Sequence, residues 1–254
     1  MIGELLLQPV VPTLQSMKAT SSDKKSLLSL ISQGYGGVAP MRKLFFSGKV
    51  HGLAAYVIWW YYSKRCSKGE SMILHNEICN IRISIDETFT VDSTDNKPYD
   101  LILNPYQKKQ SDFYKLFAIE IDLYYKVMRS ALIWDYYSYD DDCAVLDGEI
   151  LTVLQNDTIS QINIKDGALM FTKKFDCFGC NYGIYKVKKG YLIYGEIEIL
   201  ILDFDFNLMW KFSGKDIFVS VTGKKAFELC EDSIKLYDFE DNFYEIDYDG
   251  NKIE

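Results

Sequence analysis

The second half of the chain contains a degenerate internal repeat. Residues 166–171 read Asp-Gly-Ala-Leu-Met-Phe, and a similar block, Asp-Phe-Asn-Leu-Met-Trp, occupies residues 205–210. A looser copy, Glu-Asp-Asn-Phe-Tyr, occupies residues 240–244, so the copies begin at positions 166, 205 and 240. Each copy is an acidic turn followed by apolar and aromatic residues. Self-similarity at this period is typical of β-propeller blades, so the repeat constrains the architecture but names no chemistry.

The residues around the repeat favour short antiparallel strands. Residues 81–86 alternate apolar and polar side chains, as a half-buried strand does, and Asp/Asn/Gly turns separate the apolar runs that follow. Residues 191–202 form a long β run that would place Tyr194, Glu196 and Glu198 on one face. Asp122 marks an earlier copy of the repeat. At about 40–45 residues per blade, residues 72–254 hold about four units. We therefore predict a mainly β fold of antiparallel β-meander repeats, forming a small or partial β-propeller.

Two segments carry the likeness to known families. Residues 164–171 and 203–210 resemble the WD40-like and quinoprotein-like β-propeller families, and residues 210–219 also resemble uncharacterised bacterial proteins. The resemblance extends over residues 150–250 and more weakly over 76–150. It implies a propeller fold built from degenerate repeats. It brings no activity, cofactor or site residue with it.

Charge divides the chain into two parts. Residues 1–71 hold nine of the 28 Lys and Arg residues but three of the 36 Asp and Glu residues, which leaves 19 basic and 33 acidic residues in 72–254. We predict a basic, partly helical or poorly ordered N-terminal extension over 1–71 and an acidic β domain over 72–254. The acidic part should repel nucleic acid and could attract a basic protein.

The N-terminus lacks the positive region and cleavage site of a secretion signal. A cytoplasmic location with reduced cysteines is therefore expected. The longest apolar run, residues 53–62, is too short to cross a bilayer. The basic, aromatic stretch 41–66 could instead contact a membrane surface, although packing on the main domain is the favoured interpretation.

A Tyr- and Asp-rich segment over residues 135–142 is the leading candidate binding surface. Tyr is enriched at the centre of protein interfaces, and a rim of carboxylates could meet Lys or Arg of a partner. The alternative is a solvated loop between blades. The candidate residues in this segment are Tyr136, Tyr137, Tyr139, Asp140, Asp141 and Asp142.

Three further residues complete the candidate set. Glu196 and Glu198 could serve acid–base chemistry or bind a ligand, and Trp210 ends the second copy of the repeat. The one Cys-x-x-Cys, Cys177 to Cys180, lacks a second ligand pair, and the chain has two histidines, so we predict structural cysteines and neither a metal site nor a cofactor.

These observations predict a non-enzymatic, protein-binding β-repeat module, and one version is an immunity or inhibitor protein for a basic partner. The first alternative is a small-molecule or carbohydrate-binding propeller with carboxylate-based hydrolase or lyase activity. The second is a structural module of a larger assembly. Carboxylates converging in one pocket would favour the first alternative.

Overall fold

The computed structural model describes residues 71–113, 115–133, 142–220 and 222–253. Residues 1–70 lie outside this set, so the predicted N-terminal extension and the membrane contact of residues 41–66 stay predictions. Within the described ranges, no helix has the length and apolar character needed to span a membrane.

The described chain folds into four sheets that follow one another in sequence order. Sheet 1 contains β1 (Met72–His75), β2 (Asn80–Asp86), β3 (Leu101–Leu103), β4 (Leu116–Asp122) and β5 (Val127–Ile133). Sheet 2 contains β6 (Ala144–Asp147), β7 (Ile150–Gln155), β8 (Thr158–Asn163) and β9 (Leu169–Lys174). Sheet 3 contains β10 (Asn181–Val187), β11 (Gly190–Gly195), β12 (Glu198–Leu202) and β13 (Leu208–Ser213). Sheet 4 contains β14 (Phe227–Leu229), β15 (Ser233–Tyr237) and β16 (Phe243–Asp247).

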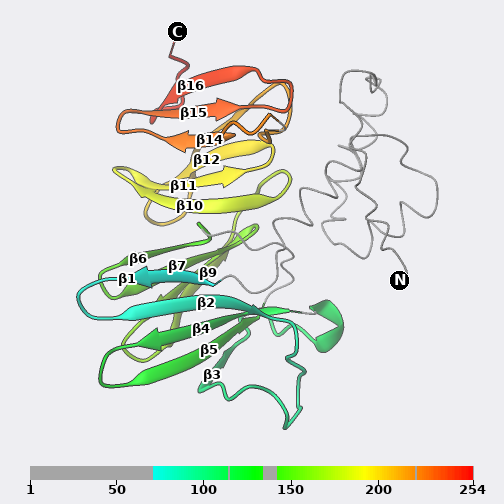
Figure 1. Cartoon of the computed structure of the whole chain (residues 1–254), viewed down its shortest axis with the longest axis vertical. Coiled ribbons are helices and arrows are strands. Elements are labelled where there is room, and N and C mark those ends of the chain that lie inside the picture. The colour runs from blue at the N-terminus through cyan, green and yellow to red at the C-terminus, as the bar shows by residue number, and fades with distance from the viewer. Residues whose placement is uncertain (1–70, 114, 134–141, 221, 254) are drawn as a thin grey trace, which may run out of the picture.

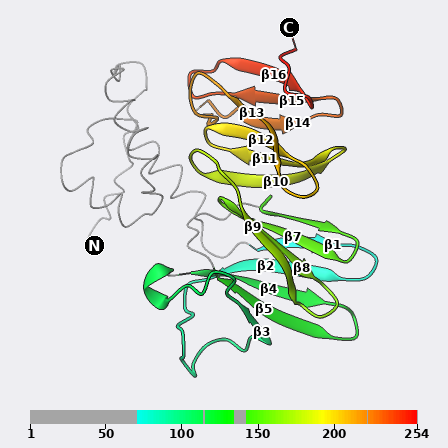
Figure 2. The same cartoon turned by 180° about the vertical axis from the view of Figure 1, so that it is seen from behind.

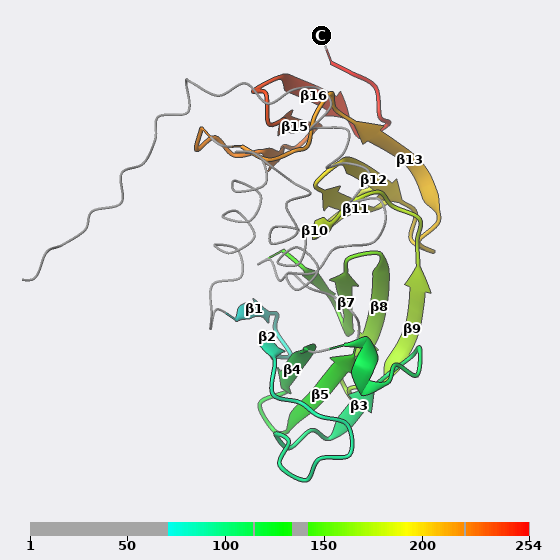
Figure 3. The ribbon, with the colours of Figure 1, turned by 90° about the vertical axis from the view of Figure 1, so that its right-hand side faces the viewer.

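Each sheet is an antiparallel meander, except that the inserted strand β3 pairs in parallel with β5. The sheets stack face to face in one row (Figures 1 and 2). The first strands of neighbouring sheets lie close together, β1 beside β6 and β6 beside β10. Seen from the side, the row is an open arc with sheets 1 and 4 at its two ends (Figure 3). The predicted mainly β, four-unit, partial propeller-like fold is therefore confirmed.

The internal repeat corresponds to the turn between the third and fourth strands of a sheet. In sheet 3 the Asp203 carboxylate accepts hydrogen bonds from the backbone N–H groups of Asp205 and Asn207 at 2.9 and 2.8 Å. Asp122 in sheet 1 and Asn163 in sheet 2 accept from the residue two positions on in the same way. Side chains of this kind stabilise tight turns by bonding to the backbone that follows them.

The third copy of the repeat, at residues 240–244, lies in a turn that is not structurally equivalent to the turns of the first two copies. Residues 238–242 form the same kind of turn, with the Asp238 carboxylate accepting from two backbone N–H groups, but they join the second and third strands of sheet 4. The structural counterpart of Asp203 is Asp247, which begins the turn before the bridge between Ile246 and Lys252. Two turns with the pattern Asp-x-acidic-x-Asn lie within fourteen positions, 238–251. The repeat identified in the sequence corresponds to the first of them, whereas the structural equivalent is the second.

The predicted long run over residues 191–202 is two strands. A two-residue turn at Glu196 and Ile197 separates β11 from β12, and Tyr194 pairs across the hairpin with Ile199. Glu196 and Glu198 therefore do not share a strand face. Both side chains are buried, and the apolar residues on either side of the turn made the two strands resemble one continuous run.

Three apolar clusters fill the spaces between the four sheets. Ile83 and Ile119 of sheet 1 pack with Leu151 and Ile162 of sheet 2. Sheets 2 and 3 meet around Leu154, Ile184, Leu200 and Phe206. Sheets 3 and 4 meet around Tyr194, Ile199, Phe218, Leu236 and Tyr244. Each inner sheet thus buries both faces, which removes apolar area from water and stabilises the row.

The outer face of sheet 1 is covered by the long connection between β2 and β4. This insertion, residues 87–115, contains β3 and the short 3₁₀ helix η2 (Gln110–Asp112). Its Phe89 and Phe113 form a fourth apolar cluster with Leu116 and Ile133 of the sheet. The insertion therefore closes this end of the row.

The outer face of sheet 4 has no such cover among the described residues. The register places Glu228, Lys235 and Glu245 side by side on three neighbouring strands of this face. The Lys235 amino group lies 3.9 Å from the Glu245 carboxylate. A polar outer face is how a terminal repeat unit stays compatible with water.

Candidate functional site

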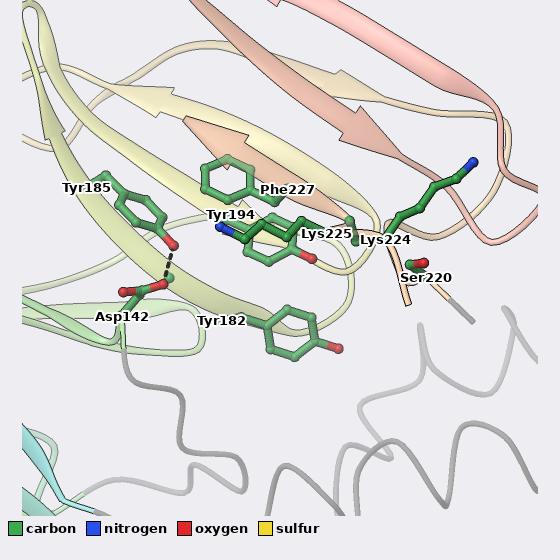
Figure 4. A pocket seen from close by; sticks show the side chains of 10 residues that line it. Asp142, Tyr182, Tyr185, Tyr194, Ser220, Lys224, Lys225 and Phe227 are labelled. Carbon is green, nitrogen blue, oxygen red and sulfur yellow. Dashed lines mark hydrogen bonds between the residues drawn. The ribbon is translucent and has the colours of Figure 1, made fainter. Parts of the chain in front are cut away.

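A pocket of about 380 Å³ opens between sheets 3 and 4, near the first strands of the sheets (Figure 4). Strands β10 and β11 supply one wall, and the connection from β13 to β14 supplies the other. Its lining consists of Asp142, Tyr182, Gly183, Tyr185, Tyr194, Ser220, Lys224, Lys225, Ala226 and Phe227. The volume is near the lower end of the range for small-molecule sites, roughly 300–1,000 Å³.

Aromatic rings form the floor of the pocket. The Tyr194 ring stacks on Phe227 with centroids 4.5 Å apart, and the Tyr185 ring lies 5.1 Å from the same Phe227 ring. Tyr182 contacts Tyr194 from the other side at 5.7 Å. Aromatic pairs of this kind contribute stabilising free energy beyond that of the apolar area they bury. The rings of the floor are therefore held in one arrangement.

The local sequence of β10 explains how these rings meet. The pairing of β10 with β11 skips Tyr182, which is the extra residue of a β-bulge, and so Gly183 and Tyr185 face sheet 4 together with Tyr194. A Cβ atom at Gly183 would lie 2.8 Å from the Tyr185 hydroxyl oxygen. Glycine at this position therefore lets the Tyr185 ring lie against its own strand.

Polar groups surround the mouth. The Tyr185 hydroxyl donates a 2.6 Å hydrogen bond to Asp142, whose backbone carbonyl also accepts from the N–H of Ile184. The Lys225 side chain extends over the rings toward this pair, whereas Lys224 points away (Figure 4). The Lys224 amino group lies 3.7 Å from Asp241 and 4.8 Å from the Tyr237 ring centre. Within the described part of the chain, Lys225 forms no ion pair, so its charge is available to a ligand.

Of the residues predicted in the Tyr- and Asp-rich segment, the structure describes one, Asp142, and places it in this pocket. Tyr136, Tyr137, Tyr139, Asp140 and Asp141 lie outside the described residues. A binding role for those five residues stays a prediction.

Glu198 holds the chain in place between sheets 2 and 3. Its carboxylate lies 2.9 Å from the Lys211 amino group and accepts a hydrogen bond from the backbone N–H of Phe178. The hydrogen bond to Glu198 raises the pKa of Lys211. Neither Glu198 nor the buried Glu196 lines the pocket, so the structure does not bring the predicted carboxylates together there.

Cys177 and Cys180 lie in the connection from β9 of sheet 2 to β10 of sheet 3. Burial raises the pKa of the Cys177 thiol to about 12, against a lowering by the Asn181 side chain. The thiol is therefore protonated near neutral pH and lacks the thiolate that redox chemistry requires. None of the cysteines that the structure describes forms a disulfide.

Trp210 packs within the row. Its indole N–H donates a 3.1 Å hydrogen bond to the carbonyl of Tyr248 in sheet 4, and its ring lies against Gly250. This contact joins sheets 3 and 4. Trp210 is half-buried there, and the binding role predicted for it stays a prediction.

An exposed apolar surface follows the outermost strands of sheets 2 and 3, which run along the outer side of the arc (Figure 3). We call it the outer-edge patch; it consists of Met170, Phe171, Phe204, Leu208 and Met209. Phe171 stacks on Phe206 of sheet 3, and Phe204 contacts Tyr191, which stacks on the same Phe206 ring. The patch therefore crosses the boundary between two sheets.

The two methionines of the outer-edge patch occupy equivalent positions. The pairing of β9 with β8 skips Met170, and the pairing of β13 with β12 skips Met209. Both are the extra residue of a β-bulge, a device that redirects a side chain at a sheet edge. The repeated Leu-Met-aromatic sequence thus encodes an exposed methionine in two successive sheets.

Sequence reasoning missed the aromatic pocket. The predicted β run over residues 191–202 contained Tyr194, but no role was assigned to Tyr182 or Tyr185, and the adjacent lysines at 224 and 225 were a visible signal. The bulge at Tyr182 changes which residues share a face, and nothing in a period-two pattern marks such a bulge.

The comparisons with known proteins add little. No protein-family model matches the chain, and no curated protein sequence matches it. Among solved structures it is similar to BamB from Moraxella catarrhalis, with 12% identity and a TM-score of 0.36, over 54% of this chain and 42% of that chain. The match thus spans less than half of that protein, and no function follows from it.

Proposed function

We propose that this protein is a non-enzymatic, protein-binding β-repeat module that contacts its partner through the outer-edge patch. The observation that carries the proposal is the set of exposed apolar side chains on β9, on β13 and in the turn that precedes β13, in two adjacent sheets. Contiguous apolar surface on a folded protein marks interaction sites, whereas single exposed residues need no explanation.

The chemistry of the outer-edge patch suits a protein partner. Exposed methionines adapt their unbranched side chains to irregular surfaces, and Phe171 and Phe204 offer larger anchors. The amino group of Lys173 donates hydrogen bonds to the Asp205 carbonyl and the Asn207 side chain, which ties the two sheets together beside the patch. Binding therefore meets a surface that is already arranged, and little ordering cost remains.

The finer form of the proposal concerns the partner. The acidic balance of residues 72–254 would speed the approach of a basic protein and raise the association rate at low salt. An immunity or inhibitor protein that occupies a basic toxin in the cytoplasm fits this description. The carboxylate-based hydrolase alternative is not favoured, because Glu196 and Glu198 lie outside the pocket.

The test compares two exposed phenylalanines. Phe204 is 52% exposed and contacts one tyrosine ring, and Phe243 on sheet 4 is 49% exposed and also contacts one tyrosine ring. The tagged full-length protein is used to capture partners from its native host at low salt, and captured proteins are identified by mass spectrometry. A partner that binds wild type and Phe243→Glu but is lost with Phe204→Glu supports the proposal.

Two results would count against it. Equal capture by wild type and Phe204→Glu would remove the outer-edge patch from the interface. A purified partner whose association rate stays constant as salt rises would contradict the basic-partner form while leaving the patch in place.

A further inference from the structure

We infer that the pocket between sheets 3 and 4 is a separate binding site for a neutral pyranose sugar. This inference is independent of the outer-edge patch, because the pocket lies near the first strands of the sheets and the patch follows their outermost strands. Three features of the pocket favour such a ligand: the aromatic floor, the charges at the mouth and the hydrogen-bonding groups beside them.

The floor offers an apolar surface made of two aromatic rings that are tilted by 33° to each other. The half-buried rings of Tyr185 and Phe227 lie 5.1 Å apart and are backed by the buried Tyr194. The C–H face of a pyranose ring is apolar and matches the negatively polarised face of an aromatic ring. The Tyr194 hydroxyl donates a 2.9 Å hydrogen bond to the Phe218 carbonyl, which holds the ring that backs the floor in place.

The charges at the mouth balance. Lys225 brings one positive charge and Asp142 one negative charge, and Lys224 is engaged by Asp241. A net charge on the ligand would gain attraction from one of the two groups and meet repulsion from the other. The described lining therefore favours a ligand without net charge.

The open hydrogen-bonding groups select hydroxyls. The Lys225 ammonium is a donor, and the Asp142 carboxylate is an acceptor with one oxygen already bonded to Tyr185. A sugar hydroxyl both accepts and donates, so adjacent hydroxyls can accept from Lys225 and donate to Asp142. The Ser220 hydroxyl, which lies 3.3 Å from the Thr222 hydroxyl, has capacity for one further hydrogen bond. A purely apolar ligand would leave these polar groups without a partner, which is costly.

The experiment is ligand-observed NMR on the full-length protein. The probes are glucose, galactose, mannose and N-acetylglucosamine, each with its methyl glycoside, and glucuronate and glucosamine as charged counterparts. We expect saturable binding of at least one neutral sugar in preference to both charged ones. Binding of the free sugar alone identifies a soluble metabolite, and equal binding of the glycoside identifies the sugar unit of a glycan.

Two variants locate the binding and two others serve as controls. Lys225→Ala and Asp142→Asn should each weaken binding about tenfold or more, because each removes a charge-assisted hydrogen bond. Lys188 is an exposed lysine in the hairpin between β10 and β11, and Lys188→Ala should leave sugar binding unchanged. Phe204→Glu should also leave it unchanged, which separates this site from the proposed protein interface.

Several outcomes would overturn the inference. These are the absence of binding by every neutral sugar, a preference for glucuronate or glucosamine, and binding that survives Lys225→Ala. A pocket that takes a peptide but no sugar would overturn it as well. Lys225 is exposed and forms no ion pair with another described residue, so its variant keeps the test valid even if Asp142→Asn fails to fold.

Discussion

The two ends of the row are finished in different ways. Sheet 1 has an apolar outer face that the insertion over residues 87–115 covers, whereas sheet 4 has a polar outer face that meets water directly. An open row of sheets must deal with two outer faces that a closed ring would pack together. An inserted segment that covers an apolar face and a polar face that contacts water are thus two ways to end the row. We expect the two ends to respond differently to mutation.

The largest difference should come from one phenylalanine at each end. Phe89 is buried against Tyr99 and Phe113, and Phe243 is half exposed on sheet 4. We expect Phe89→Ala to lower the free energy of unfolding by about 3–5 kcal/mol through lost burial and a cavity. Phe243→Ala should cost about 1 kcal/mol or less. Urea unfolding of both variants measures the contrast, and equal losses would refute it.

The polar anchor of the insertion should give the next largest effect. The buried Asp86 carboxylate accepts hydrogen bonds from Tyr99 and Thr88 and lies 3.5 Å from the Lys97 amino group. Burial alone would raise the pKa of Asp86, but these hydrogen bonds and Lys97 outweigh it and lower the pKa. Asp86→Asn should cost about 2–3 kcal/mol at neutral pH.

This cost should depend on pH in a defined direction. Because the folded-state pKa of Asp86 is lowered, its contribution is complete above the unfolded value of about 4 and is lost as pH falls through the folded-state pKa. The difference between wild type and Asp86→Asn should therefore begin to shrink as pH falls to about 4 and should keep shrinking toward the lower folded-state pKa. A difference that stays constant over this range would show that the charge does not matter.

A pair of glycines tests how sheet 4 is joined to sheet 3. Gly250 has a φ of +86° and a Cβ there would lie 3.0 Å from the Trp210 ring, whereas Gly148 has a φ of +56° with nothing within 4 Å. Gly148→Ala should cost about 1 kcal/mol from backbone strain alone. Gly250→Ala should cost about 2 kcal/mol because the ring must also move. Thermal unfolding of the two variants isolates the contact, and equal shifts would exclude it.

The smallest effect should come from the outer face of sheet 4 itself. Lys235 and Glu245 are partly exposed and 3.9 Å apart, and pairs of this kind contribute little. Lys235→Ala should change the free energy of unfolding by less than about 0.5 kcal/mol. A larger loss in a urea titration would mean that this face is not simply solvated.

The sequence predicted the strands and turns better than their arrangement. The period-two pattern at Ile81 to Asp86 and the turns at Asp122 and Asp203 are local, and the structure places them as predicted. These signals need no knowledge of distant residues, because an Asp side chain bonds to the backbone two positions on.

The parts that the sequence did not predict depend on distant contacts. The insertion that covers sheet 1, the open ends of the row and the pocket each join residues far apart in the chain, such as Asp142 and Lys225. The bulges at Tyr182, Met170 and Met209 change which side chains share a face of the sheet, and no residue type in the sequence marks where they occur. The two central positions of the turn, Glu196 and Ile197, are not Gly, Pro or Asn, and Gly195 just before them is a weaker signal within an apolar run.

The parallel strand β3 also sets an order of events during synthesis. Leu101 pairs with Ser130, so β3 has no partner in β5 until about thirty more residues have emerged from the ribosome, as their numbers show. Sheets 2 and 3 need contacts between consecutive strands alone and can form hairpin by hairpin. Contacts between distant segments delay folding because a long loop must close first. The cover over sheet 1 is therefore completed late relative to its own first hairpin, and Phe89 and Phe113 are exposed to solvent and to chaperones in the interval.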